Sequence, residues 1–318
     1  MVNLVAAQKP LMHWLMKQAG VMPHIVEIEE GTVMNFWVPT ETVKTQSTDK
    51  ASNINGGHDE KGKSKTAKPV VVLIHGFAAE GIVTWQFQVG SLTKKYSVYV
   101  PDLLFFGGST TSRTDRSKAF QAECVAKGLR KLGVKRCIVV GFSYGGMVAF
   151  EMAEKYPELI DALVISGSCI DIVDSKIDNI GFNSSSELLL PTSVEGLKNL
   201  FKVATYRNIW FPDRLHRDFL EVMFNHREER AELLDDLANQ KGCTKHKFQQ
   251  KIHLLWGEND QIFLLDVAQR MKGLLGEKVT LQGIKKAGHL VHLERPCAYN
   301  RCLKEFLATL AEDETKND

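Results

Sequence analysis

The sequence predicts an α/β fold in which a mostly parallel sheet carries a helical insertion late in the chain. Short apolar runs rich in β-branched residues indicate strands buried on both faces, and helical patterns lie between several of them. Such alternation implies right-handed crossovers between parallel strands. It stops between residues 165 and 252, where only helical patterns occur. A chain of 318 residues has room for one large domain with such an insertion.

The sheet is expected to begin at residues 24–38, which read as two strands around a turn at residues 29–32. Residues 40–68 are polar and contain almost no large apolar side chain, so they cannot offset their ordering entropy and we expect a mobile loop there. Further strands are expected at residues 70–74, 97–100, 137–140, 162–165, 252–256 and 279–281, with helices at 117–131, 144–155 and 264–275.

The insertion shows helical patterns at residues 194–206, 213–225 and 227–240. The predicted organisation is an N-terminal amphipathic segment (1–24), the first part of the core (25–168), a helical cap (169–250) and the second part of the core (251–318).

Charge and cysteine content exclude several classes of protein. The 40 basic and 38 acidic residues leave a net charge of +2, without the basic excess of a nucleic-acid-binding protein. The six cysteines form no CxxC pair, which predicts reduced thiols, no zinc site and a cytoplasmic location.

The N-terminal segment is apolar but carries Lys9, Pro10 and Lys17, which is too polar for a spanning helix and unlike a signal peptide. Two interpretations remain: an amphipathic helix packed on the domain, or an interfacial segment that contacts a membrane or covers the pocket. The apolar residues at roughly helical spacing are Leu11, Trp14, Leu15 and Met22.

Residues 141–146 (GFSYGG) follow a predicted strand and precede a predicted helix. A sharp strand-to-helix turn exposes a serine as a nucleophile, and flanking glycines let strand and helix approach. Ser143 is therefore the candidate nucleophile, although a glycine-rich turn with an idle serine gives the same string. The helix start also supplies the backbone amide of Tyr144 to an oxyanion, and the amide of Phe77, in the loop after residues 70–74, is the second expected donor. The nearby His75 is expected to be structural.

Two later motifs supply an acid and a base. Asp260 follows the strand at residues 252–256 and can orient a histidine, with Glu258 as the alternative. His289 follows the last predicted strand and can act as the base, with His292 as its competitor. Ser143, Asp260 and His289 occur in this order along the chain, and each follows a strand. This order is a further reason to expect a catalytic triad.

These motifs resemble the α/β-hydrolase superfamily over nearly the whole chain, from about residue 25 to 310. Their spacing looks like the single-cap branch, which includes monoacylglycerol lipases, carboxylesterases and meta-cleavage-product carbon–carbon hydrolases. The N-terminal segment and the region around Trp210 are similar to plant members. The resemblance implies an eight-stranded sheet, a helical cap over the pocket and no cofactor. A serine at position 143 disfavours the epoxide hydrolase branch, and Phe77-Ala78-Ala79 departs from the glycine-rich run usual in carbon–carbon hydrolases.

The expected function is hydrolysis of a small-molecule acyl or aromatic carboxylic ester through an acyl-enzyme. The pocket is expected between the sheet edge and the cap, with walls from Phe142, Trp210 and Phe211. The alternatives are carbon–carbon bond hydrolysis, acyl transfer and a low-turnover small-molecule receptor. The sequence indicates no metal site and leaves both the substrate and the oligomeric state open.

Overall fold

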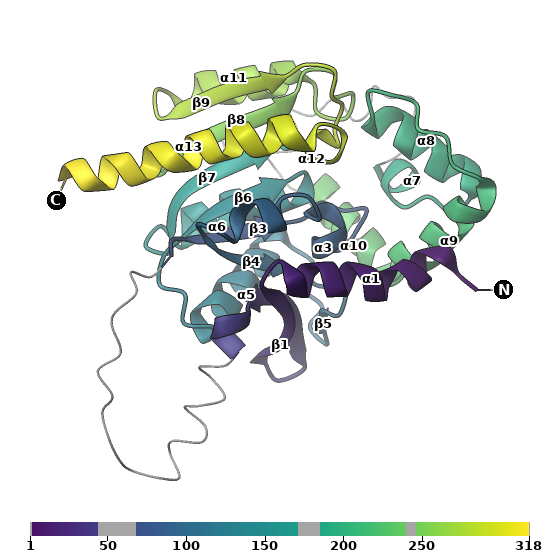
Figure 1. Ribbon diagram of the computed structural model, residues 1–318. Coiled ribbons are helices and arrows are strands. Elements are labelled where there is room, and N and C mark those ends of the chain that lie inside the picture. Colours follow the sequence, from purple (N-terminus) through teal and green to yellow (C-terminus); the bar gives the residue numbers. More distant parts are fainter. Residues whose placement is uncertain (1, 44–67, 171–184, 240–245, 318) are drawn as a thin grey trace, which may run out of the picture.

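The computed structural model describes residues 2–43, 68–170, 185–239 and 246–317 (Figure 1). Within these residues the strands form one sheet of nine, in the order β1-β2-β4-β3-β6-β7-β8-β9, with β5 paired to β2. The two-residue β5 lies off this path, so the path itself contains the expected eight strands.

The sheet is antiparallel at one end and parallel through the rest. The antiparallel end contains β1 (Val21–Glu29), β2 (Thr32–Pro39) and β5 (Thr110–Thr111). The parallel strands are β3 (Val70–Ile74), β4 (Ser97–Pro101), β6 (Cys137–Phe142), β7 (Ile160–Ser166), β8 (Lys251–Gly257) and β9 (Val279–Ile284). Every predicted strand is present, and their parallel arrangement brings the carboxyl ends of β3 to β9 to one edge.

Helices cover both faces of the sheet. One face packs against α5 (Lys118–Lys131), α6 (Tyr144–Lys155) and α11 (Leu265–Leu275). The other packs against α1 (Leu4–Gln18), α3 (Gly81–Thr84), α4 (Val89–Leu92) and α13 (Pro296–Asn317). Alternate side chains serve the two faces: Val72 and Ile74 belong to the first core, Val71 and Leu73 to the second. This double burial explains the unbroken apolar runs in the sequence.

The insertion between β7 and β8 contains α7 (Ser185–Leu189), α8 (Val194–Ala204), α9 (Asp213–Met223) and α10 (Arg227–Asn239). Three of these helices were predicted, and α7 was not. Buried Arg230 ties α10 to the core, because its guanidinium donates to the backbone oxygens of Phe105 and Met223 and lies over the ring of Phe106. Most of the loop predicted at 40–68 lies outside the described residues.

The N-terminal helix is present, but it buries a different face from the predicted one. Val5 and Met16 are buried, whereas Leu11, Trp14 and Leu15 are 58%, 55% and 45% exposed. The helix therefore packs on the domain through Val5 and Met16 rather than through these three residues, and Met22 belongs to β1. In the part of the chain that the structure describes, no helix is long and apolar enough to cross a membrane.

Candidate active site

Ser143 occupies a sharp turn between β6 and α6. Its backbone has a φ of 52°, an uncommon conformation for a residue with a side chain. The turn is held by hydrogen bonds, since the Ser143 amide donates to the Ser166 carbonyl over 2.9 Å and the Ser168 hydroxyl donates to the Ser143 carbonyl over 2.7 Å. The strained serine is fixed from both sides.

Glycines allow this turn to form. A Cβ atom on Gly145 would lie 2.3 Å from the carbonyl oxygen of His75, and one on Gly141 would lie 2.7 Å from that of Gly145. Both contacts are with backbone atoms, which cannot move aside as the end of a flexible side chain can. The strand, the helix and the β3 loop therefore approach closely only because these positions lack side chains.

Two side chains from separate loops, His289 and Asp260, form a chain of contacts with Ser143. The Nε2 atom of His289 lies 3.1 Å from Ser143 Oγ, and its Nδ1 atom lies 2.9 Å from Asp260 Oδ2. The other carboxylate oxygen of Asp260 accepts bonds from the backbone amides of Ile262 and Phe263, both at 2.9 Å. With Nδ1–H donating to the carboxylate, Nε2 is free to accept the serine proton.

The competing residues lie elsewhere. Glu258 is exposed on the turn after β8, whereas Asp260 is buried at 3% exposure against His289. His292 is fully buried among the rings of Trp85, Phe142 and Tyr299. Burial and the neighbouring His289 lower the pKa of His292 to about 3, so it stays neutral behind the site. The structure thus brings together Ser143, Asp260 and His289.

His292 and Glu294 lie on one short helical turn but contact different partners. This turn is α12 (Val291–Glu294), and Glu294 accepts hydrogen bonds from the backbone amides of Tyr206 and Gly288. The final helix, α13, begins only at Pro296.

Two backbone amides are available next to Ser143. Among the described residues, no hydrogen-bond acceptor is found for the amides of Phe77 and Tyr144. The rings of these residues are buried and lie edge to face, with centroids 5.8 Å apart. His75 fixes the loop that carries Phe77, because its Nδ1 donates to the Gly76 carbonyl and its Nε2 accepts from the Leu103 amide. Burial lowers the pKa of His75 to about 4, which keeps it in this neutral bridging form.

A cavity of about 480 Å³ lies beside the site. Its lining includes Ala78 and Ala79 from the loop that follows Phe77, and Leu290, which follows His289. Phe211, one of the three aromatic residues expected in the pocket wall, also lines this cavity. The structure differs for the other two aromatic residues. Trp210 is 82% exposed, and Phe142 is buried between His289 and His292.

Similarity to known proteins agrees with this architecture. Residues 69–210 match the model of the alpha/beta hydrolase fold family. Monoacylglycerol lipase ABHD6 of Bos taurus is 26% identical over 268 residues, covering 76% of each chain. A 2-hydroxy-6-oxononadienedioate/2-hydroxy-6-oxononatrienedioate hydrolase of a Pseudomonas species is 25% identical over 249 residues, covering 75% of this chain and 88% of its own. The structure of a putative lipase from Acinetobacter baumannii superposes with a TM-score of 0.77 at 20% identity, covering 96% and 97%.

The chain has the α/β-hydrolase fold. In this fold the three side chains follow β6, β8 and β9, and the Phe77 loop follows β3, so all four meet at one sheet edge. The relatives do not support the predicted resemblance to plant members.

Sequence reasoning missed Glu294, which connects the loop that carries His289 to the insertion between β7 and β8. One carboxylate oxygen accepts from the Gly288 amide at 2.6 Å, and the other accepts from Tyr206 at 2.8 Å. Gly288 directly precedes His289, so this bridge fixes the base relative to the insertion. The signal in the sequence was a carboxylate five residues after the candidate base.

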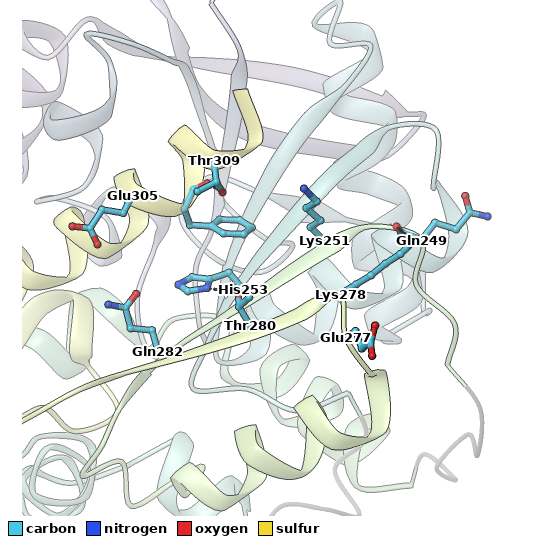
Figure 2. Close-up of a pocket in the computed structure, with 10 residues that line it drawn as sticks. Gln249, Lys251, His253, Glu277, Lys278, Thr280, Gln282, Glu305 and Thr309 are labelled. Atoms are coloured by element: carbon cyan, nitrogen blue, oxygen red, sulfur yellow. Dashed lines mark hydrogen bonds between the residues drawn. The ribbon is translucent and has the colours of Figure 1, made fainter. Parts of the chain in front are cut away.

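A second cavity, of about 610 Å³, lies where β8 and β9 begin and against α13 (Figure 2). His253 lies within it, stacked on Phe306 and bonded through Nδ1 to Thr280 Oγ1 at 2.7 Å. This cavity is at the amino ends of the strands, away from the edge that carries Ser143. In the described ranges, no three His, Cys, Asp or Glu side chains lie close enough to hold a metal ion.

Proposed function

We propose that this protein is a serine hydrolase that cleaves carboxylic esters through an acyl-enzyme. The observation that carries the proposal is the unbroken contact from Ser143 through His289 to Asp260. Asp260 holds the imidazole in the tautomer that presents an unprotonated Nε2 to the serine. The similarity to a monoacylglycerol lipase and to a putative lipase supports the same reaction class.

The mechanism follows from the geometry. His289 takes the proton of Ser143 as Oγ attacks the ester carbonyl, and the tetrahedral oxyanion accepts hydrogen bonds from the amides of Phe77 and Tyr144. His289 then protonates the leaving alcohol. In the second half, His289 deprotonates a water molecule, which attacks the acyl-enzyme and releases the acid and Ser143.

The substrate class is inferred from the cavity. Its lining includes aliphatic and aromatic side chains such as Val83, Leu215 and Phe219, which suit an acyl chain. Residues 169–250 would act as the cap over the bound acyl chain. As a second candidate, carbon–carbon bond hydrolysis uses the same triad and is favoured by the similarity to the Pseudomonas hydrolase.

We also propose that the enzyme is cytoplasmic and contacts a membrane peripherally through its N-terminal segment. Cys124, Cys137, Cys297 and Cys302 are free thiols among the described residues, which fits a reducing compartment.

The test is labelling with a fluorophosphonate probe beside turnover of p-nitrophenyl esters of graded chain length. We expect wild type to be labelled and to turn over esters, and Ser143→Ala to lose both. Labelling without ester turnover, together with cleavage of a vinylogous diketone, would favour carbon–carbon hydrolysis. Absence of labelling in a folded wild-type protein would contradict the triad.

A further inference from the structure

The helix α1 has two faces with different surroundings. Its inner face carries Val5, Lys9 and Met12, which line the 480 Å³ cavity beside the active site. Lys9 also pairs with Glu80 on the core at 3.1 Å, so the helix is held in place over the cavity. Another face of the helix presents apolar side chains to solvent.

The outer face forms a continuous apolar stripe. Leu4, Leu11 and Leu15 lie at positions i, i+7 and i+11, which share one side of a helix, and Trp14 lies beside them. All four side chains are at least 41% exposed. The helix contains no Asp or Glu, and its charged residues are Lys9 and Lys17. An apolar stripe with only basic charges is typical of helices that lie in a lipid interface.

A second apolar segment borders the same cavity. Between α8 and α9, Tyr206, Ile209 and Trp210 are 42%, 44% and 82% exposed, and Ile209 also lines the cavity. Eight of the eleven large apolar side chains that are exposed in the described chain lie in residues 2–15 and 206–210. Exposed apolar side chains are normally scattered, so this concentration indicates a binding surface.

Hydrogen bonds connect α1 to α9, the helix that follows the 206–210 segment. The Leu4 amide donates to the Asp218 carboxylate at 2.8 Å, and Arg214 donates to the Val2 carbonyl at 2.9 Å. Both partners belong to α9, which begins just after the 206–210 segment. In Figure 1, α1 extends from the sheet to α9 at the end of the molecule that carries the insertion. The two apolar segments are therefore held together around one cavity.

We propose that the outer face of α1 and residues 206–210 form one docking surface for a phospholipid bilayer, from which the cavity receives the acyl chain of a lipid ester. The second half rests on the proposed esterase function. Trp14, Tyr206 and Trp210 are residue types that favour the membrane interface. Lys17 and Arg207 add attraction to anionic headgroups.

Tryptophan fluorescence offers a direct test, because Trp37, Trp85 and Trp256 are buried while Trp14 and Trp210 are exposed. Vesicles of phosphatidylcholine and phosphatidylglycerol with brominated acyl chains should quench the tryptophan fluorescence of the protein. Trp14→Phe and Trp210→Phe should each remove part of the quenching, and the double variant should remove nearly all of it. All samples carry Ser143→Ala, so lipid is not consumed and the result does not depend on turnover.

Vesicle co-sedimentation measures the affinity. Replacing Leu11 and Leu15 with serine should lower partitioning by roughly ten-fold or more, because both side chains lose their apolar burial in lipid. The matched control is Leu274→Ser, since Leu274 is 75% exposed on α11, outside the docking surface. Equal partitioning of all variants, or equal loss in the control, would overturn the proposal. The proposal would also be overturned if wild type formed a dimer, the double serine variant were monomeric, and neither protein bound vesicles.

Activity separates this inference from the proposed function. With Ser143 intact, the Leu11 and Leu15 variant should retain turnover of a soluble short-chain ester and lose turnover of monoacylglycerol in vesicles. Equal activity on both substrates would refute lipid delivery. Vesicle binding that depends on these side chains, in a protein with no ester turnover, would keep the docking surface and refute the esterase.

Discussion

Gly167 offers the sharpest test of how the site is assembled. It follows β7 with a φ of 53°, and a Cβ atom there would lie 2.7 Å from His289 Nδ1 and 3.1 Å from Asp260 Oδ2. Alanine at this position would therefore press on the hydrogen bond between base and carboxylate. Gly167→Ala should displace the imidazole of His289 while leaving every triad residue in the chain.

Two effects determine the magnitude. A positive φ costs a residue with a Cβ atom about 1–2 kcal/mol, which lowers the free energy of unfolding. A displacement of the base by a few tenths of an ångström to about 1 Å lowers the rate by about 10²-fold. We therefore expect kcat/KM for a p-nitrophenyl ester to fall about 100-fold, with a loss of unfolding free energy of about 1–3 kcal/mol.

Two control variants separate strain from steric conflict. Gly133 also has a positive φ, 81°, but nothing lies within 4 Å of its added Cβ, so Gly133→Ala should lose stability and keep activity. Gly273 lies in α11 with open space around it, and Gly273→Ala should gain up to about 1 kcal/mol. Urea unfolding and steady-state kinetics measure both quantities. Unchanged kcat/KM in Gly167→Ala, or an equal loss in Gly133→Ala, would refute the reasoning.

Three further predictions concern single side chains. Asp260→Asn should lower kcat by about 10⁴-fold with little change in melting temperature, because the amide favours the wrong tautomer of His289; a loss under ten-fold would point to another carboxylate. Glu294→Gln should lower the free energy of unfolding by about 1–2 kcal/mol in urea titrations and reduce kcat, because Gly288 loses a charged acceptor; an effect on neither would contradict the bridge. His292 has a folded pKa below the unfolded 6.5, so its contribution to stability is present above pH 6.5 and is lost as pH falls towards 3. His292→Leu should remove a slope of about 1.4 kcal/mol per pH unit in that window, and an unchanged slope in pH-dependent urea unfolding would refute its burial as a neutral ring.

The sequence predicted local structure best at positions where the physical environment permits only one kind of residue. The GFSYGG run predicted the turn at Ser143, because glycine is required where strand, helix and loop backbones touch. The apolar runs predicted the strands, because burial on both faces removes polar positions. The signal was weaker for α1, where two stripes of apolar residues compete and the burial of Val5 and Met16 decides the orientation.

By itself, the sequence determined the order of strands and helices and the candidates Ser143, Asp260 and His289, since these depend on neighbours along the chain. Only the tertiary structure decided between His289 and His292, because which ring reaches Ser143 depends on where separate loops converge. It alone revealed the bridge at Glu294 and the exposed stripe of α1. Contacts between residues distant in the chain arise from packing, which local periodicity does not encode.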